Sequence, residues 1–164
     1  MEYFANFPTI TLQNNTTMTN ICARVDFFNA IKSNAQLFEE LQILDGEKPE
    51  DVAIIAYNDP TLYWVILWCN DIVNVYTDWP LNSTQLMNYV IAQYGAENIF
   101  EPHHYETTSE SDLGEGIIVN EGTPFSIAVS NFDYEDGLNE AKRYIKILQP
   151  QYISQVLQEY SKIF

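Results

Sequence analysis

The sequence predicts a small α+β protein, a class indicated by its length, its apolar content and the order of its element signals. The chain has 164 residues, of which 46% are hydrophobic, which suits one domain with a buried core and short arms. Strand-like apolar runs alternate with segments that carry helix start signals. We therefore expect an extended N-terminal arm at 1–20, a helix and strand body at 21–100, a hairpin with acidic loops at 101–141, and a C-terminal strand and helix arm at 142–164.

The N-terminal part of the chain gives the weakest signals. Residues 1–20 are rich in Asn and Thr, and their apolar side chains follow no clear period, which predicts an extended arm. Residues 25–30 fit either a short strand or a helical turn. Residues 38–44 then predict a strand that ends at the turn signal Asp45-Gly46.

Two consecutive helices follow, and each begins with a proline. Pro49 suits the first position of a helix over residues 49–57, whose first turn also carries two acidic residues. Asp59 as the N-cap and Pro60 as the first residue start a second helix over residues 60–69. This second segment is apolar on nearly every side, so we expect it to be buried all round. A buried strand fits its periodicity as well, but the Asp-Pro start favours a helix.

A β-hairpin is expected in the second half of the chain. Residues 98–106 look extended, and residues 107–115 form a polar, acidic loop. Residues 116–119 and 125–129 are strand-like and flank the turn-rich sequence Asn-Glu-Gly-Thr. This arrangement is typical of two antiparallel strands joined by a short turn.

Two further helices and one strand complete the expected elements. Asn82 with a glutamine three positions later resembles a capping box, and Gly95 is a helix stop signal. Residues 142–148 alternate partly and predict a strand, after which Pro150 opens the last helix. That helix either packs on its own domain or docks on a partner, and we expect it to dock. Its apolar stripe consists of Ile153, Val156, Leu157, Tyr160, Ile163 and Phe164.

The charge of the chain excludes two classes of partner. Its 23 acidic and 7 basic residues give a net charge of −16, and no base lies between Pro49 and Ala141. Such a surface repels nucleic-acid phosphates and anionic membranes, so we expect neither partner. The longest apolar run has eight residues, against the ~20 of a spanning helix, and the N-terminus does not read as a secretory signal. The acidic centre fits either a partner with a basic surface or solubility alone.

No catalytic residue, cofactor or metal site is predicted. The two histidines, His103 and His104, are adjacent, so in a strand they point to opposite faces and do not bind one metal. Cys22 and Cys69 lie in unrelated contexts, which argues against a disulfide framework. The sequence lacks a glycine-rich phosphate loop and a nucleophile turn. In a chain this acidic, neighbouring carboxylates carry no information about acid–base catalysis.

Aromatic residues form the strongest local signal. Six of them fall within 23 positions: Tyr57, Tyr63, Trp64, Trp68, Tyr76 and Trp79. Trp64 and Trp68 lie in the apolar helix and are expected in the core. Tyr76 and Trp79 lie beyond that helix and suit either a ligand platform or a protein contact.

Four separated motifs give the sequence its likeness to a known family. The first is GEKPEDVAIIAYNDPTLYWVILWCNDIVNVYTDWPL at residues 46–81, whose final Asp-Trp-Pro-Leu counts as the second. His104-Tyr105-Glu106 and NEAKRYIKILQPQYI at residues 139–153 follow. In this order they resemble the gene-product-fifty-three family, the baseplate wedge proteins of contractile-tailed phages, over roughly residues 20–155. Residues 38–76 are also similar to a LysM module, which has the order strand, helix, helix, strand.

The resemblance implies a structural, non-enzymatic protein of the virion tail, made in the cytoplasm of the bacterial host. Several copies around the baseplate ring would join neighbouring wedges during assembly, with other wedge subunits as partners. The LysM likeness leaves one alternative open, a module that binds peptidoglycan or chitin, and a small cell-wall hydrolase is a second alternative. The residues expected at protein interfaces are Tyr76, Trp79, Lys142, Arg143, Tyr144, Ile145, Lys146, Ile147 and Phe164.

Overall fold

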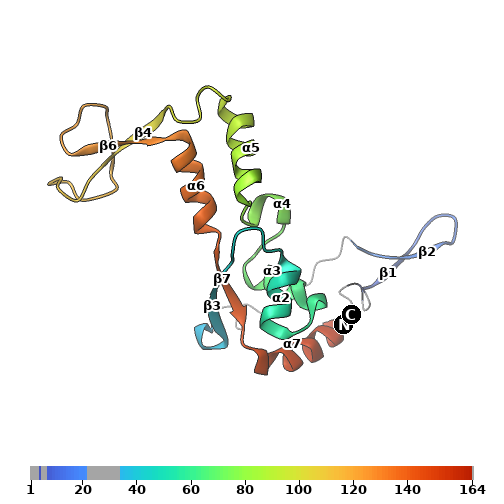
Figure 1. The fold of residues 1–164 in the computed structure, drawn as a ribbon. Helices are drawn as coiled ribbons and strands as arrows, with labels where there is room; N and C mark the ends of the chain where they lie inside the picture. The colour runs from blue at the N-terminus through green and yellow to red at the C-terminus, as the bar shows by residue number, and fades with distance from the viewer. Residues whose placement is uncertain (1–3, 5–6, 22–33, 164) are drawn as a thin grey trace. The chain divides into compact units, whose positions relative to one another are not determined.

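A computed structural model describes residue 4, residues 7–21 and residues 34–163, except the side chains of Ala35 and of residues 161–163. The protein has the predicted α+β fold, and its chain divides into two compact units (Figure 1). Residues 25–30 and Phe164, for which we made predictions, lie outside the described residues. Unit 1 consists of Met1–Ile43, Glu47–Asp78 and Tyr144–Phe164, and unit 2 of Leu44–Gly46 and Trp79–Arg143.

Unit 1 contains two small antiparallel sheets and several helices. The first sheet is a hairpin within the segment expected to be an extended arm, with Thr9 opposite Thr19. The second pairs β3 with β7, from Phe38 opposite Leu148 to Gln42 opposite Tyr144. The described elements of this unit are β1 (Thr9–Thr11), β2 (Thr17–Thr19), η1 (Ala35–Leu37), β3 (Phe38–Gln42), α2 (Pro49–Tyr57), η2 (Pro60–Leu62), α3 (Tyr63–Cys69), α4 (Val75–Asp78), β7 (Tyr144–Leu148) and α7 (Pro150–Ile163).

Both proline-initiated helices are confirmed. α2 begins at Pro49, and the Asp51 carboxylate accepts a hydrogen bond from the backbone N–H of Lys48. The predicted second helix begins with the single 3₁₀ turn η2 and continues as α3. Asp59 is its N-cap, and the Asp59 carboxylate accepts a hydrogen bond from the Thr61 N–H at 2.9 Å. No residue from 62 to 70 is exposed, as expected for a helix without a polar face.

The strand expected at the end of the LysM-like segment is not present near Tyr76. The Asp78 carboxylate instead accepts hydrogen bonds from the backbone N–H groups of Val73, at 3.1 Å, and Asn74, at 2.9 Å. These bonds stabilise the short helix α4, because a side chain that satisfies local N–H groups competes with a sheet ladder. The strand that partners β3 is therefore β7, from much later in the chain. Likeness to a LysM module itself remains a prediction.

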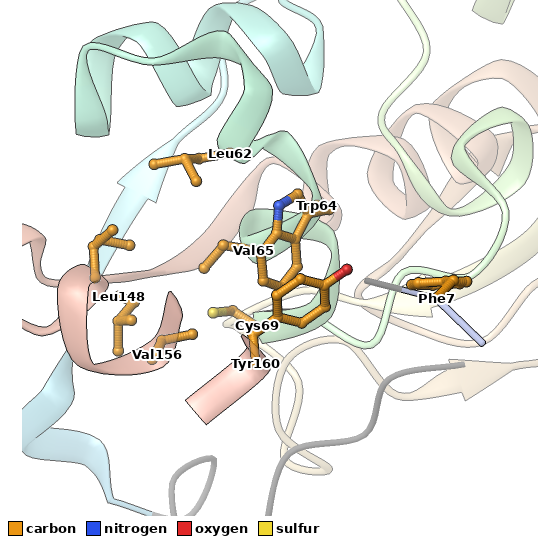
Figure 2. Close-up of a cluster of buried hydrophobic side chains, with 9 residues drawn as sticks. Phe7, Leu62, Trp64, Val65, Cys69, Leu148, Val156 and Tyr160 are labelled. Atoms are coloured by element: carbon orange, nitrogen blue, oxygen red, sulfur yellow. The ribbon is translucent and has the colours of Figure 1, made fainter. Parts of the chain in front are cut away.

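The core of unit 1 joins α3 to β7 and α7. The rings of Trp64 and Tyr160 are tilted against each other, with centroids 4.9 Å apart, and Val65, Leu148 and Val156 lie to one side of them in the same cluster (Figure 2). The apolar stripe of α7 is therefore not bare, as the sequence had led us to expect. Three of its residues, Ile153, Val156 and Tyr160, are buried in the core of their own unit. The helix needs this cover because an amphipathic face left in water gains no free energy of burial.

Unit 2 contains two helices and one three-stranded sheet. α5 starts as predicted: the Asn82 side chain accepts a hydrogen bond from the Gln85 N–H, and the Gln85 side chain accepts one from the Asn82 N–H. It ends at Gly95, whose φ of 89° lies where glycine is favoured. The elements of this unit are α5 (Ser83–Tyr94), β4 (Pro102–Thr107), β5 (Ile118–Val119), β6 (Ser126–Ser130) and α6 (Asn131–Ala141).

The predicted hairpin of residues 116–129 is wrong in its pairing, although both strands form. The strand order is β5-β4-β6, and both outer strands run antiparallel to β4, so they are parallel to each other. A short turn cannot place two parallel strands side by side. β4 lies between them. Hydrogen bonds continue on both sides at the end of β4, where the Thr107 N–H donates to the Ile117 carbonyl and the Thr108 N–H donates to the Phe125 carbonyl.

A buried asparagine holds α6 against the start of α5, and we expect its loss to destabilise unit 2. The Asn139 amide accepts a hydrogen bond from the Leu81 N–H at 2.7 Å and donates one to the Leu81 carbonyl at 3.0 Å. Asn139→Ala leaves both backbone groups without this partner, so the free energy of unfolding should fall by about 2 kcal/mol. Urea unfolding followed by circular dichroism measures the loss. Asn139→Asp keeps the acceptor but sets a buried carboxylate oxygen against the Leu81 carbonyl, so it should lose at least as much, and an unchanged Asn139→Ala midpoint would contradict the prediction.

Candidate protein interface

The predicted interface residues lie in different environments. Tyr76 and Tyr144 are exposed, with 89% and 65% of their surface accessible, and Lys146 is exposed as well. Lys142 is half-buried. The others described are buried within the chain: Trp79, Arg143, Ile145 and Ile147. Whether any of these residues contacts a partner remains a prediction.

Arg143 serves the packing of unit 2. Its guanidinium donates to the Asp45 carboxylate at 3.1 Å and also pairs with Glu140. Asp45 accepts two further hydrogen bonds from Ser83, one from its hydroxyl at 2.8 Å and one from its N–H at 3.1 Å. The hydroxyl bond is the main reason why the pKa of Asp45 is lowered, and Arg143 lowers it further. This network joins the short segment Leu44–Gly46 to the rest of unit 2.

The three-stranded sheet of unit 2 has no apolar core of its own. Thr107 is the one buried residue in its strands, all of which the structure describes. The sheet and the loops at its ends nevertheless carry several exposed apolar side chains, which are Leu113, Ile117, Ile118, Phe125 and Ile127. An uncovered sheet that displays apolar side chains is typical of a surface that a partner covers.

Strand register places two of these side chains on one face. Glu106 lies directly opposite Ile118 on β5 and opposite Ile127 on β6, and directly paired residues share a face. His104, paired with Val129, lies on the same face two residues away. We call these five residues the Glu106 face: His104, Glu106, Ile118, Ile127 and Val129.

Hydrogen bonds fix the polar part of the Glu106 face. His104 Nε2 lies 2.8 Å from Glu106 Oε1, and the Nδ1 atoms of His103 and His104 lie 2.8 Å apart. The two histidines therefore do not point to opposite faces as predicted, because β4 is irregular at this point. His103 sits at an irregularity of β4 and stacks on Tyr134 of α6, with ring centroids 4.0 Å apart. The sheet is thereby held to α6, so the Glu106 face is presented on a fixed support. Among the described residues, no group of three or more His, Cys, Asp or Glu is placed to hold a metal ion.

Tyr94 and Glu135 link the two helices that support the sheet, and their hydrogen bond predicts a pH dependence. The Tyr94 hydroxyl donates to the Glu135 carboxylate at 2.8 Å, which is the main cause that raises the Tyr94 pKa to about 12. The folded pKa exceeds the unfolded value of about 10, so this bond stabilises the fold fully below pH ~10 and is lost as the pH rises through 12. Glu135→Gln should move the Tyr94 pKa toward 10. Phenolate absorbance during an alkaline titration, with Tyr94→Phe as the reference, measures the shift, and an unchanged titration would contradict it.

The surroundings of the sheet are uniformly acidic. Residues 101–130 contain six carboxylates and no lysine or arginine: Glu101, Glu106, Glu110, Asp112, Glu115 and Glu121. On the opposite face of the sheet, the Tyr105 hydroxyl donates a hydrogen bond to the Glu121 carboxylate. This bond is the main cause that raises the Tyr105 pKa. Exposed apolar side chains in a segment this acidic suit recognition of a protein surface.

Comparison with known proteins decides the family. The sequence model described as base plate wedge protein 53 matches residues 1–111, which is more than half of the chain. The chain belongs to the base plate wedge protein 53 family. It is therefore a structural protein of the phage baseplate and a component of the virion tail. No curated protein matches the chain.

The match to the base plate wedge protein 53 family confirms the resemblance but differs from it in extent. It includes the first 20 residues, which the resemblance left out, and it ends in the loop after β4. The motif of residues 139–153 lies beyond it.

The described residues contain no single helix long and apolar enough to cross a membrane. α2 and the following helical segment reach that length and apolarity only together, with a bend of 117° between them.

Sequence reasoning missed the Glu106 face of this wedge protein. Residues 116–119 and 125–129 were expected as strands, but alternation alone does not reveal which neighbour a strand pairs with. The helix α6 that supports the face was also missed. Its one usable signal is Ser130 followed by Asp133, a capping pattern in which the Ser130 hydroxyl accepts a hydrogen bond from the Asp133 N–H at 3.1 Å.

Proposed function

We propose that this protein joins neighbouring wedges during baseplate assembly, with several copies around the ring. The observation that supports the proposal is the division of this wedge-family chain into two units, each with its own buried cluster. A connector needs at least two contact surfaces, and two separately packed units can provide them. Its partners are other wedge subunits, it is made in the host cytoplasm, and it acts through surface recognition rather than catalysis.

Reconstitution of the baseplate from purified wedges tests this proposal. Wedges prepared without the chain should remain separate, and adding the purified full-length chain should close them into rings that electron microscopy can count. Rings that close equally well without the chain would contradict the proposal. A chain that binds single wedges without promoting rings would contradict the joining role but keep a structural one.

The charge of the chain predicts that assembly is sensitive to salt. Residues 49–141 hold 16 carboxylates and no lysine or arginine, so long-range attraction should guide a basic partner toward them. The Debye length falls from ~10 Å at 0.1 M salt to ~3 Å at 1 M, so the rate of ring formation should fall as salt rises. Light scattering during ring formation measures this rate. A rate independent of salt would leave solubility as the role of the charge.

A further inference from the structure

We propose that the Glu106 face docks on a basic, apolar-centred surface of another baseplate protein. The Glu106 face consists of Ile118, Glu106, Ile127, His104 and Val129, and this inference rests on the function proposed above. It names the surface of unit 2 that makes the contact and the chemistry of the partner.

The apolar centre of this surface comes from two isoleucines. Ile118 and Ile127 are 69% and 56% exposed, and they lie on either side of Glu106, about 10 Å apart by ordinary strand spacing. Covering an exposed isoleucine removes apolar surface from water, which suits the centre of a contact. Nothing in their own sheet provides that cover, because the strands contain no buried apolar residue.

Glu106 between the isoleucines does not oppose docking. A carboxylate that loses its water without a partner is costly to cover, but Glu106 already has His104 Nε2 at 2.8 Å. His104 is in turn mostly covered and bonded to His103. A basic side chain from the partner would add a second donor to the carboxylate.

The charge around the face selects the kind of partner. The loop between β4 and β5 carries Glu110, Asp112 and Glu115, and residues 101–130 contain no lysine or arginine. A surface with lysine or arginine around an apolar centre complements this arrangement. A second copy of the chain would bring the same acidic sheet, and like charges would oppose the contact. The occupant is therefore a different protein of the baseplate.

A competition experiment tests the apolar centre. Full-length chain and the double variant Ile118→Ser/Ile127→Ser are mixed in equal amounts with wedges, and mass spectrometry measures the ratio of the two chains bound to the wedges, whether or not rings have closed. We expect about tenfold less of the variant, as for loss of a contact centre. The matched control Ile55→Ser, at a 62% exposed isoleucine of unit 1, should be incorporated equally with the unaltered chain. Equal incorporation of the double variant, or equal exclusion of the control, would overturn the proposal.

Two further measurements keep the result unambiguous. The first is thermal unfolding, in which the variants should match the unaltered chain because the replaced side chains are exposed. The second places a photo-crosslinker at Ile127 of the otherwise unaltered chain, which gives a result even if the double variant does not fold. A crosslink to a peptide of another baseplate protein that contains lysine or arginine supports the proposal; a crosslink to a second copy, or none, overturns it. Incorporation is scored separately from ring closure, so failure of the joining function leaves this test readable.

The charge of the loop is tested by reversal. Glu115→Lys should reduce incorporation and weaken its salt dependence, whereas Glu39→Lys, at an exposed carboxylate on β3 of unit 1, should do neither. Equal effects of the two substitutions would overturn the assignment of the basic partner to this surface.

Discussion

Trp64→Ala should lower the free energy of unfolding of unit 1 by about 3–5 kcal/mol, the range for a large aromatic side chain removed from a core. The Trp64 side chain is 4% exposed and contacts Tyr160 across the core. Alanine leaves a cavity between α3 and α7, and the surrounding groups can fill it only partly. The expected loss is a large part of the 5–15 kcal/mol that stabilises an ordinary domain.

Hydrogen exchange measured by mass spectrometry suits this test because it reports on each unit separately. Peptides from α3 and β7 should lose protection in the variant, while peptides from α5 and α6 should not. Tyr76→Ala is the matched control, since it removes another aromatic ring of unit 1 that is 89% exposed, and it should change stability by no more than about 0.5 kcal/mol. A loss below about 1 kcal/mol at Trp64 would mean that its ring is not a core side chain.

Removing residues 150–164 should unfold unit 1 altogether. The deletion takes away Ile153, Val156 and Tyr160, each of which packs in the core, and truncation of one such side chain costs about 2–5 kcal/mol. Their sum reaches or exceeds the whole stability of a marginal domain. The docking role that the sequence suggested for this helix would instead leave a folded body that fails to assemble.

The same exchange measurement distinguishes the two outcomes. Loss of protection throughout β3, α2 and α3 supports a core role for α7, whereas preserved protection would support a docking arm. Gln155→Ala, on the exposed side of α7, is the control and should leave exchange unchanged.

Local signals predicted the helices well, because the residues that start them act over three or four positions. Asp59 and Asn82 both cap helices as expected, and both bonds lie within three residues of the cap. The position of Trp64 also followed from sequence, because a helix without a polar face must be buried.

Long-range pairing could not be predicted in the same way. The partner of β3 lies about a hundred residues later, and no local pattern distinguishes it from a nearer strand. The apolar stripe of α7 looked the same whether it packed on its own unit or on a partner. For the Glu106 face, the decisive fact is that β4 lies between β5 and β6, which places Ile118 and Ile127 on one surface.

The pairing of β3 with β7 also determines when unit 1 can finish folding during synthesis of the chain. Gln42 and Tyr144, opposite each other in this sheet, are 102 positions apart, and ribosomes add about 5–20 residues per second. For roughly 5–20 s the nascent chain therefore carries β3 and the apolar helix α3 without the strand and helix that will cover them. Residues 79–143 emerge as one stretch during this interval and can begin to pack first. We therefore expect unit 1 to fold last, and the newly made chain to be most prone to aggregate in the seconds before α7 has emerged.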